Sequence, residues 1–140
     1  MMSDNHPSNG HVKEVKIFFV SVLIITGGQD DAESLSTVEV FVPSTNKTCS
    51  LPSLPVKTIH HSQDQLTQCG GAESPKTCYT FTNGTWLETA TLINERISHR
   101  SWSSPDGIVL IGGHRQERTT EKISHSGLST RGFYLIDDVK

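Results

Sequence analysis

Short apolar runs, many of them alternating with polar residues, are spaced along most of the chain. The alternation has a period of two at residues 37–42 and 77–81, and residues 108–111 form a continuous apolar run. A period of two places alternate side chains on the two faces of a strand, so these segments predict β-strands. A chain built from such runs, with many glycines and prolines between them, is expected to be all-β.

Turn signals join these runs. Asn83-Gly84 stands between two strand-like segments, and both positions of a type I′ turn need positive φ, which these two residues tolerate. Residues 104–107, Ser-Pro-Asp-Gly, form a second turn signal, because proline restricts φ and Asp-Gly favours closure. Consecutive strands joined by tight turns form an antiparallel meander.

One pattern occurs three times, at a period of about 40 residues. In each copy an apolar run ends at two glycines, a polar loop follows, and another strand-like run comes next, at residues 37–42, 77–81 and 119–123. A fourth run closes the unit and is clearest at residues 84–88. Glycine has no Cβ and suits a strand end where the backbone runs tight. The paired glycines are Gly27, Gly28, Gly70, Gly71, Gly112 and Gly113.

The residues between the glycine pairs carry a family resemblance. An aromatic residue follows in the next strand, Phe41 or Tyr79, then comes Trp86, and then Glu-Arg-x-x-His at residues 95–99. This order resembles the kelch repeat. The resemblance implies a β-propeller in which Gly-Gly ends the second strand of each four-stranded blade.

A narrower pattern is similar to kelch-type propellers of secreted invertebrate proteins: Cys69-Gly-Gly, Cys78-Tyr and Asn83-Gly-Thr-Trp. In such a blade Cys69 ends the second strand and Cys78 begins the third, which brings them opposite one another, near the separation that a disulfide needs. The alternative is two small buried thiols in a reducing cell. Cys49 is left over, either free or paired with a segment outside this chain.

Two segments match the N-glycosylation sequon, Asn46-Lys-Thr and Asn83-Gly-Thr. Together with the cysteine placement they favour an extracellular protein, with a cytoplasmic one as the alternative. Asn83 has a second explanation, because the turn of its hairpin itself favours asparagine.

The domain organisation follows from the repeat. Residues 1–16 are polar and lack periodicity, which predicts a disordered lead-in. Residues 17–140 are expected to form a propeller segment, with units at about 17–56, 57–96 and 97–140. Propellers close with about four to eight blades, so three units predict an incomplete ring that needs further blades or another chain.

Charge and motifs exclude several functions. The net charge is −3, and no run of like charge is longer than Asp30-Asp31, so nucleic acid is not an expected partner. Residues 17–25 suit either a buried strand or a signal-peptide segment, and are well short of the roughly 20 apolar residues that span a bilayer. No zinc-ligand spacing, nucleophile elbow or phosphate loop occurs. No catalytic residue, metal or cofactor is therefore expected.

Several large side chains are predicted to be structural. None of the seven histidines shows metal-ligand spacing. The histidines at recurring strand or loop positions are His60, His61, His99, His114 and His125. Arg96 and His99 are predicted to pack between blades and to orient the link from one blade to the next. Trp86 and Trp102 are expected to be wedges between blades, because large rings suit a crowded interface.

The loops after the glycine pairs are predicted to share one face of the propeller and to differ in charge. Functional residues gather on such loops, and kelch relatives commonly bind partners with this face. Charged loops suit a protein-binding rim. The alternative is solvated loops without a binding function, which have the same composition. The candidate binding residues are Asp30, Asp31, Glu33, Glu73, Lys76, His114, Arg115, Glu117 and Arg118.

The sequence therefore predicts a non-catalytic kelch-type scaffold that binds a protein or glycan partner. One alternative is a copper enzyme like galactose oxidase, which has the same blade repeat and needs a Tyr, His and Cys ligand set. Tyr79 and Tyr134 are the only tyrosines. The other alternative is an intracellular adaptor that presents substrates for ubiquitylation, which would require an additional recruiting domain.

Overall fold

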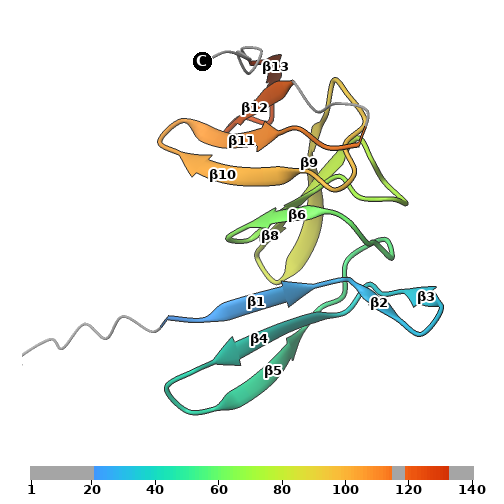
Figure 1. Ribbon diagram of the computed structural model, residues 1–140. Coiled ribbons are helices and arrows are strands. Elements are labelled where there is room, and N and C mark those ends of the chain that lie inside the picture. Colours follow the sequence, from blue (N-terminus) through green and yellow to red (C-terminus); the bar gives the residue numbers. More distant parts are fainter. Residues whose placement is uncertain (1–20, 115–118, 133–140) are drawn as a thin grey trace, which may run out of the picture.

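The computed structural model of the chain describes residues 21–114 and 119–132. Within these residues the elements are all β-strands, arranged in three antiparallel sheets and one two-stranded hairpin (Figure 1). The predicted all-β fold is confirmed, and the unclosed stack of sheets fits an incomplete propeller. The predicted lead-in at residues 1–16 lies outside the described residues.

The first sheet has the strand order β1-β4-β5, formed by Leu23–Thr26, Val38–Val42 and Lys47–Leu51. Strand β1 covers the end of the apolar segment for which a strand and a signal peptide were the alternatives. Between β1 and β4 the chain makes a small hairpin of β2 (Gln29–Asp30) and β3 (Glu33–Ser34). This hairpin lies where the sequence predicts a polar loop, because strands of two residues have no detectable alternation.

The second sheet has the order β6-β7-β8-β9, with four strands in sequence order. The β8–β9 turn confirms the Asn-Gly prediction, since Asn83 has φ 50° and Gly84 has φ 82°. The strands are Ser62–Asp64, Thr67–Cys69, Thr77–Thr82 and Thr85–Thr91.

The third sheet repeats this meander in the order β10-β11-β12-β13. The predicted Ser-Pro-Asp-Gly turn joins its first two strands, with Ser104 paired to Gly107. The strands are Arg100–Ser104, Gly107–Ile111, Thr120–Ser124 and Ser129–Arg131. Four-stranded units, as predicted, are therefore present in two consecutive sheets.

The core lies between the sheets rather than within one of them. Between the first and second sheets, Val38, Leu54, Tyr79 and Trp86 form one buried cluster. Trp86 is the predicted wedge: it is 6% exposed, and its indole N–H donates to the backbone oxygen of Pro52 at 2.8 Å. Burying this large ring between sheets holds the first sheet against the second.

A second buried cluster lies between the second and third sheets, formed by Cys69, Cys78, Ala90, Leu92, Leu110 and Ile123. Trp102 does not contribute to either cluster and is 66% exposed, so its role as a wedge between blades stays a prediction. It alternates along β10 with Ser103, whose hydroxyl donates to Asp64 of the second sheet. Trp102 therefore lies on the other face of the third sheet, where the described residues provide no neighbouring sheet.

Cys69 and Cys78 form a disulfide between directly paired positions of β7 and β8. Both residues are almost fully buried, at 2% and 0% exposure, whereas Cys49 is exposed and free. The pairing of β7 with β8 places the two cysteines opposite one another, and both belong to the apolar cluster between the second and third sheets.

Replacing both Cys69 and Cys78 by alanine is expected to lower the free energy of unfolding by about 2–3 kcal/mol, because the bridge restricts the unfolded chain over a short loop. Urea unfolding followed by circular dichroism measures the change. Cys49→Ala is the matched control and should stay within about 0.5 kcal/mol of the wild type. A double variant as stable as Cys49→Ala would contradict the prediction.

Candidate functional site

The loops that follow the glycine pairs lie at one end of the sheets, and we call this end the loop face. Residues 27–37 connect β1 to β4 there, and residues 70–76 connect β7 to β8. We call the segments that connect successive sheets links: residues 52–61 join β5 to β6, and residues 92–99 join β9 to β10. Val38 pairs with Leu51, so the first link starts beside the loop that enters β4. In Figure 1 the β2–β3 hairpin projects from this end of the first sheet, opposite the β4–β5 turn.

Backbone hydrogen bonds fasten each link to the glycine pairs on both sides of it. The N–H of Gly28 donates to the oxygen of Thr58 at 2.9 Å, and the N–H of Ala72 donates to the oxygen of Ile59 at 3.0 Å. The junction between the second and third sheets repeats the arrangement. There the N–H of Gly71 donates to the Arg96 oxygen at 3.0 Å, and the N–H of His114 donates to the Ile97 oxygen at 2.8 Å. The link between two sheets thus carries the loops of both.

Side chains from successive loops meet on this face. Glu33 of β3 is 3.1 Å from the Nζ of Lys57 in the link between the first two sheets. The Ser34 hydroxyl donates to Glu73, which lies in the loop of the second sheet. Glu73 also accepts the backbone N–H of Ile59 at 3.3 Å. These contacts join the first loop, the link and the second loop into one polar surface.

The other candidate binding residues have different surroundings. Asp30 and Asp31 are exposed around the β2–β3 turn, where Asp31 has φ 35°. Lys76 is exposed in the second loop, and its backbone oxygen accepts the N–H of Leu92 at 2.6 Å. His114 follows the third glycine pair. The remaining candidates, Arg115, Glu117 and Arg118, lie outside the described residues.

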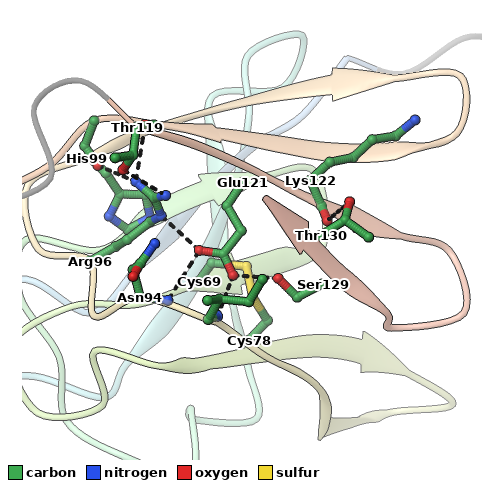
Figure 2. Close-up of polar contacts among 12 residues, drawn as sticks. Cys69, Cys78, Asn94, Arg96, His99, Thr119, Glu121, Lys122, Ser129 and Thr130 are labelled. Carbon is green, nitrogen blue, oxygen red and sulfur yellow. Dashed lines mark hydrogen bonds and ion pairs between the residues drawn. A yellow bond between two sulfur atoms is a disulfide. The ribbon is translucent and has the colours of Figure 1, made fainter. Parts of the chain in front are cut away.

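Beneath the loop face, Arg96 and Glu121 form an ion pair that is fully buried on both sides. Arg96 Nε lies 3.1 Å from Glu121 Oε2, and its Nη1 donates to the backbone oxygen of Gly112 at 2.6 Å. Glu121 also accepts the N–H of Ile93 and the hydroxyl of Ser129 (Figure 2). Arg96 therefore reaches from the link into the third sheet, which extends the blade-packing role that was predicted for it.

His99 and His61 occupy equivalent positions in the two links and contact hydroxyl groups of the sheet before them. His99 Nε2 lies 2.7 Å from the Ser62 hydroxyl, and His61 Nε2 lies 2.9 Å from that of Thr26. Burial, followed by the positive charge of Arg96, lowers the pKa of His99 to about 4. Burial also lowers the pKa of His61.

The lowered pKa of His99 makes stability depend on pH. Between about pH 6.5 and pH 4 the unfolded chain binds more protons than the folded chain, so stability that is fully present above this window is lost as the pH falls. We expect the melting temperature of the wild type to fall as the pH falls through this window. The melting temperature of His99→Gln should fall less steeply. The exposed-turn variant His125→Gln should follow the wild-type profile. Parallel profiles for all three proteins would contradict this expectation.

Sequence reasoning missed three of the residues that build this region. Glu121 gave a usable signal, because strand alternation places it on the same face as the buried Ile123. A carboxylate on an inward face indicates buried partners, and in the structure the charged partner is Arg96. Lys57 and Ser34 gave no such signal, since their contacts depend on how two loops approach each other.

The described residues contain no group of three His, Cys, Asp or Glu side chains that could hold a metal ion. Tyr79, one of the two tyrosines considered for a copper site, is buried among Val38, Leu54 and Trp86. Burial and the nearby charge of Glu88 raise the pKa of Tyr79. Over residues 21–114 and 119–132 no helix is both long and apolar enough to cross a membrane.

Four-stranded antiparallel meanders that stack face to face, with a connecting link at each junction, define the β-propeller class, here as an unclosed segment. A family model of the kelch motif matches residues 21–55, the part of the chain from β1 through the end of β5. This match and the all-β structure support a kelch-repeat family. Kelch-repeat domains are generally non-catalytic modules of protein interaction. No curated protein matches the chain.

Proposed function

We propose that this chain is a non-catalytic kelch-type scaffold that binds a protein partner with its loop face, outside the cell. The observation that carries the proposal is the contact of Ser34 with Glu73, together with the Lys57–Glu33 ion pair. Through these contacts the loops of two successive sheets present one continuous polar surface. A rigid sheet stack that displays variable charged loops is well suited to protein recognition.

Acidic side chains predominate on the described part of this surface. Asp30, Asp31, Glu33 and Glu73 are exposed there, while Lys57 is paired with Glu33. Complementary charge accelerates association and selects among partners, so a partner with a basic patch is favoured. The extracellular setting is supported by the buried Cys69–Cys78 disulfide, because structural disulfides persist in oxidising compartments.

Charge reversal tests the assignment of the face. The full chain is immobilised and exposed to conditioned medium, and the retained proteins are quantified by mass spectrometry. The double variant Asp30→Lys, Asp31→Lys is expected to retain at least several-fold less of the proteins that the wild type retains, with a weaker dependence on salt.

The double variant Glu88→Lys, Asp106→Lys is the matched control, because it changes the net charge by the same amount at exposed carboxylates away from the loop face, on β9 and in the β10–β11 turn. This variant should retain the same proteins as the wild type. Equal losses in both variants would indicate binding by net charge alone and would overturn the proposal. So would undiminished binding by the loop-face variant.

A further inference from the structure

Two asparagines occupy the tips of equivalent hairpins in neighbouring sheets. Asn46 lies in the β4–β5 turn and Asn83 in the β8–β9 turn, and both have a left-handed backbone, with φ of 51° and 50°. Each is exposed, and so are Thr48 and Thr85, which stand two positions later and complete the two sequons. The sequence pattern and the exposed turn therefore coincide twice.

The side-chain amides of the two asparagines do not take part in closing these turns. The β4–β5 turn is closed by the backbone, through Thr45 N–H to the Val42 oxygen at 3.2 Å and Asn46 N–H to the Pro43 oxygen at 3.3 Å. Neither side-chain amide of the two asparagines makes a hydrogen bond to the part of the chain that the structure describes. A Cβ added at Gly84 would meet no atom within 4 Å, so the space around that tip is open.

The corresponding turn of the third sheet, between β12 and β13, lacks both the sequon and the open surroundings. It has no asparagine, and a Cβ at Gly127 would lie 2.2 Å from the backbone oxygen of Thr89 in the second sheet. His125 in the same turn lies 3.1 Å from the oxygen of Pro105. This tip is packed against its surroundings, whereas the two tips that carry sequons are free of such contacts.

We propose that Asn46 and Asn83 each carry an N-linked oligosaccharide, a modification that rests on the extracellular part of the proposed function. The donor is an oligosaccharide linked to a lipid pyrophosphate. A bond forms between the asparagine Nδ2 and the anomeric carbon of the first sugar, and the bond from that carbon to the pyrophosphate oxygen breaks. The lipid pyrophosphate leaves with the electron pair, and the amide proton passes to a base of the transferase.

The positions of the two sites separate the sugars from the loop face. Strand β4 runs from residue 38, at the loop face, to residue 42, beside the Asn46 turn, and β8 spans residues 77 to 82 in the same sense. At about 3.3 Å per residue, each tip is roughly 15–20 Å from the loops. Bulky, hydrated sugars at these tips would cover one end of the sheets and leave the proposed binding surface uncovered.

The test is translation of the full chain behind a cleavable secretion signal in the presence of endoplasmic-reticulum microsomes. Gel mobility is compared before and after peptide N-glycosidase. Each glycan slows the chain by one step of gel mobility, and the glycosidase removes that step. We expect digestion to remove two steps from the wild type and one step each from Thr48→Ala and Thr85→Ala. The double variant should show no step. Thr48→Ser and Thr85→Ser should keep both steps, because serine also completes the sequon.

Gln65→Asn is the positive control, since it completes a sequon with Thr67, lies exposed in the β6–β7 turn with the same left-handed φ of 50°, and reports that the chain has reached the transferase. If this variant gains a step while the wild type shows none, the inference is overturned. A single wild-type step, abolished by one of the two alanine variants, overturns it for the other site. These readouts do not involve the partner, so they leave the charge-reversal test of the loop face independent.

Discussion

Arg96→Ala is expected to lower the free energy of unfolding by about 3–5 kcal/mol. Arg96 and Glu121 are both 0% exposed, so removing the guanidinium leaves the Glu121 carboxylate buried without its cation. The substitution also removes the donors to the oxygen of Gly112 and the hydroxyl of Thr119 (Figure 2). Chemical denaturation of the full chain, monitored by circular dichroism, measures this loss.

The control for this prediction is an ion pair at the surface. Lys122 pairs with Asp106 at 3.0 Å, with side chains 39% and 76% exposed. Lys122→Ala is expected to change stability by less than about 1 kcal/mol, because water screens exposed pairs. Similar small losses for both substitutions would mean that Arg96 does not compensate a buried charge.

Gly71→Ala is expected to destabilise the fold by roughly 1–3 kcal/mol more than Gly28→Ala. Both glycines are second in their pair and have nearly equal φ, 108° and 104°, so an alanine would be strained equally at either position. They differ in surroundings. A Cβ at Gly71 would lie 2.2 Å from Thr58 Oγ1 and 2.9 Å from the Ile59 oxygen, whereas a Cβ at Gly28 would meet nothing within 4 Å.

The comparison of these two variants separates two contributions to the loss of stability. Backbone strain acts in both variants, whereas the clash of the new Cβ with a link acts only in Gly71→Ala. Thermal and urea unfolding of both proteins under the same conditions give the difference directly. Gly113 provides a further case, because a Cβ there would lie 2.9 Å from the Ile97 oxygen of the next link. If Gly28→Ala proved as costly as Gly71→Ala, the glycine pairs would serve turn geometry alone and not the packing of links.

Both effects concern the same structural unit, the link that passes over a glycine pair and carries a histidine. At the second junction this link contains Arg96, while at the first junction the equivalent residue is Thr58, which is buried. The two junctions therefore share their backbone hydrogen bonds and differ in side chains. The shared bonds position the loop face, and the ion pair adds stability at one junction only.

Local signals explain why much of the fold was predictable. Strand alternation, the Asn83-Gly84 turn and the glycine pairs each depend on a few neighbouring residues, and the structure has the expected element at each. The wedge role of Trp86 was also predictable, since a large ring in a repeated blade is best buried at the interface between blades. Trp102 has the same side chain, yet the sequence could not show that its face of the sheet would have no neighbouring sheet.

The sequence by itself determined the strands, the tight turns, the repeat and the kelch resemblance, because each is encoded within one unit of the chain. Only the tertiary structure decided that Arg96 pairs with Glu121, that Glu73 meets Ser34, and that the two sequon tips are exposed while the third tip is packed. These features depend on which surfaces of successive units face each other. Side-chain contact between units is a matter of distance in space, and local periodicity carries no information about it.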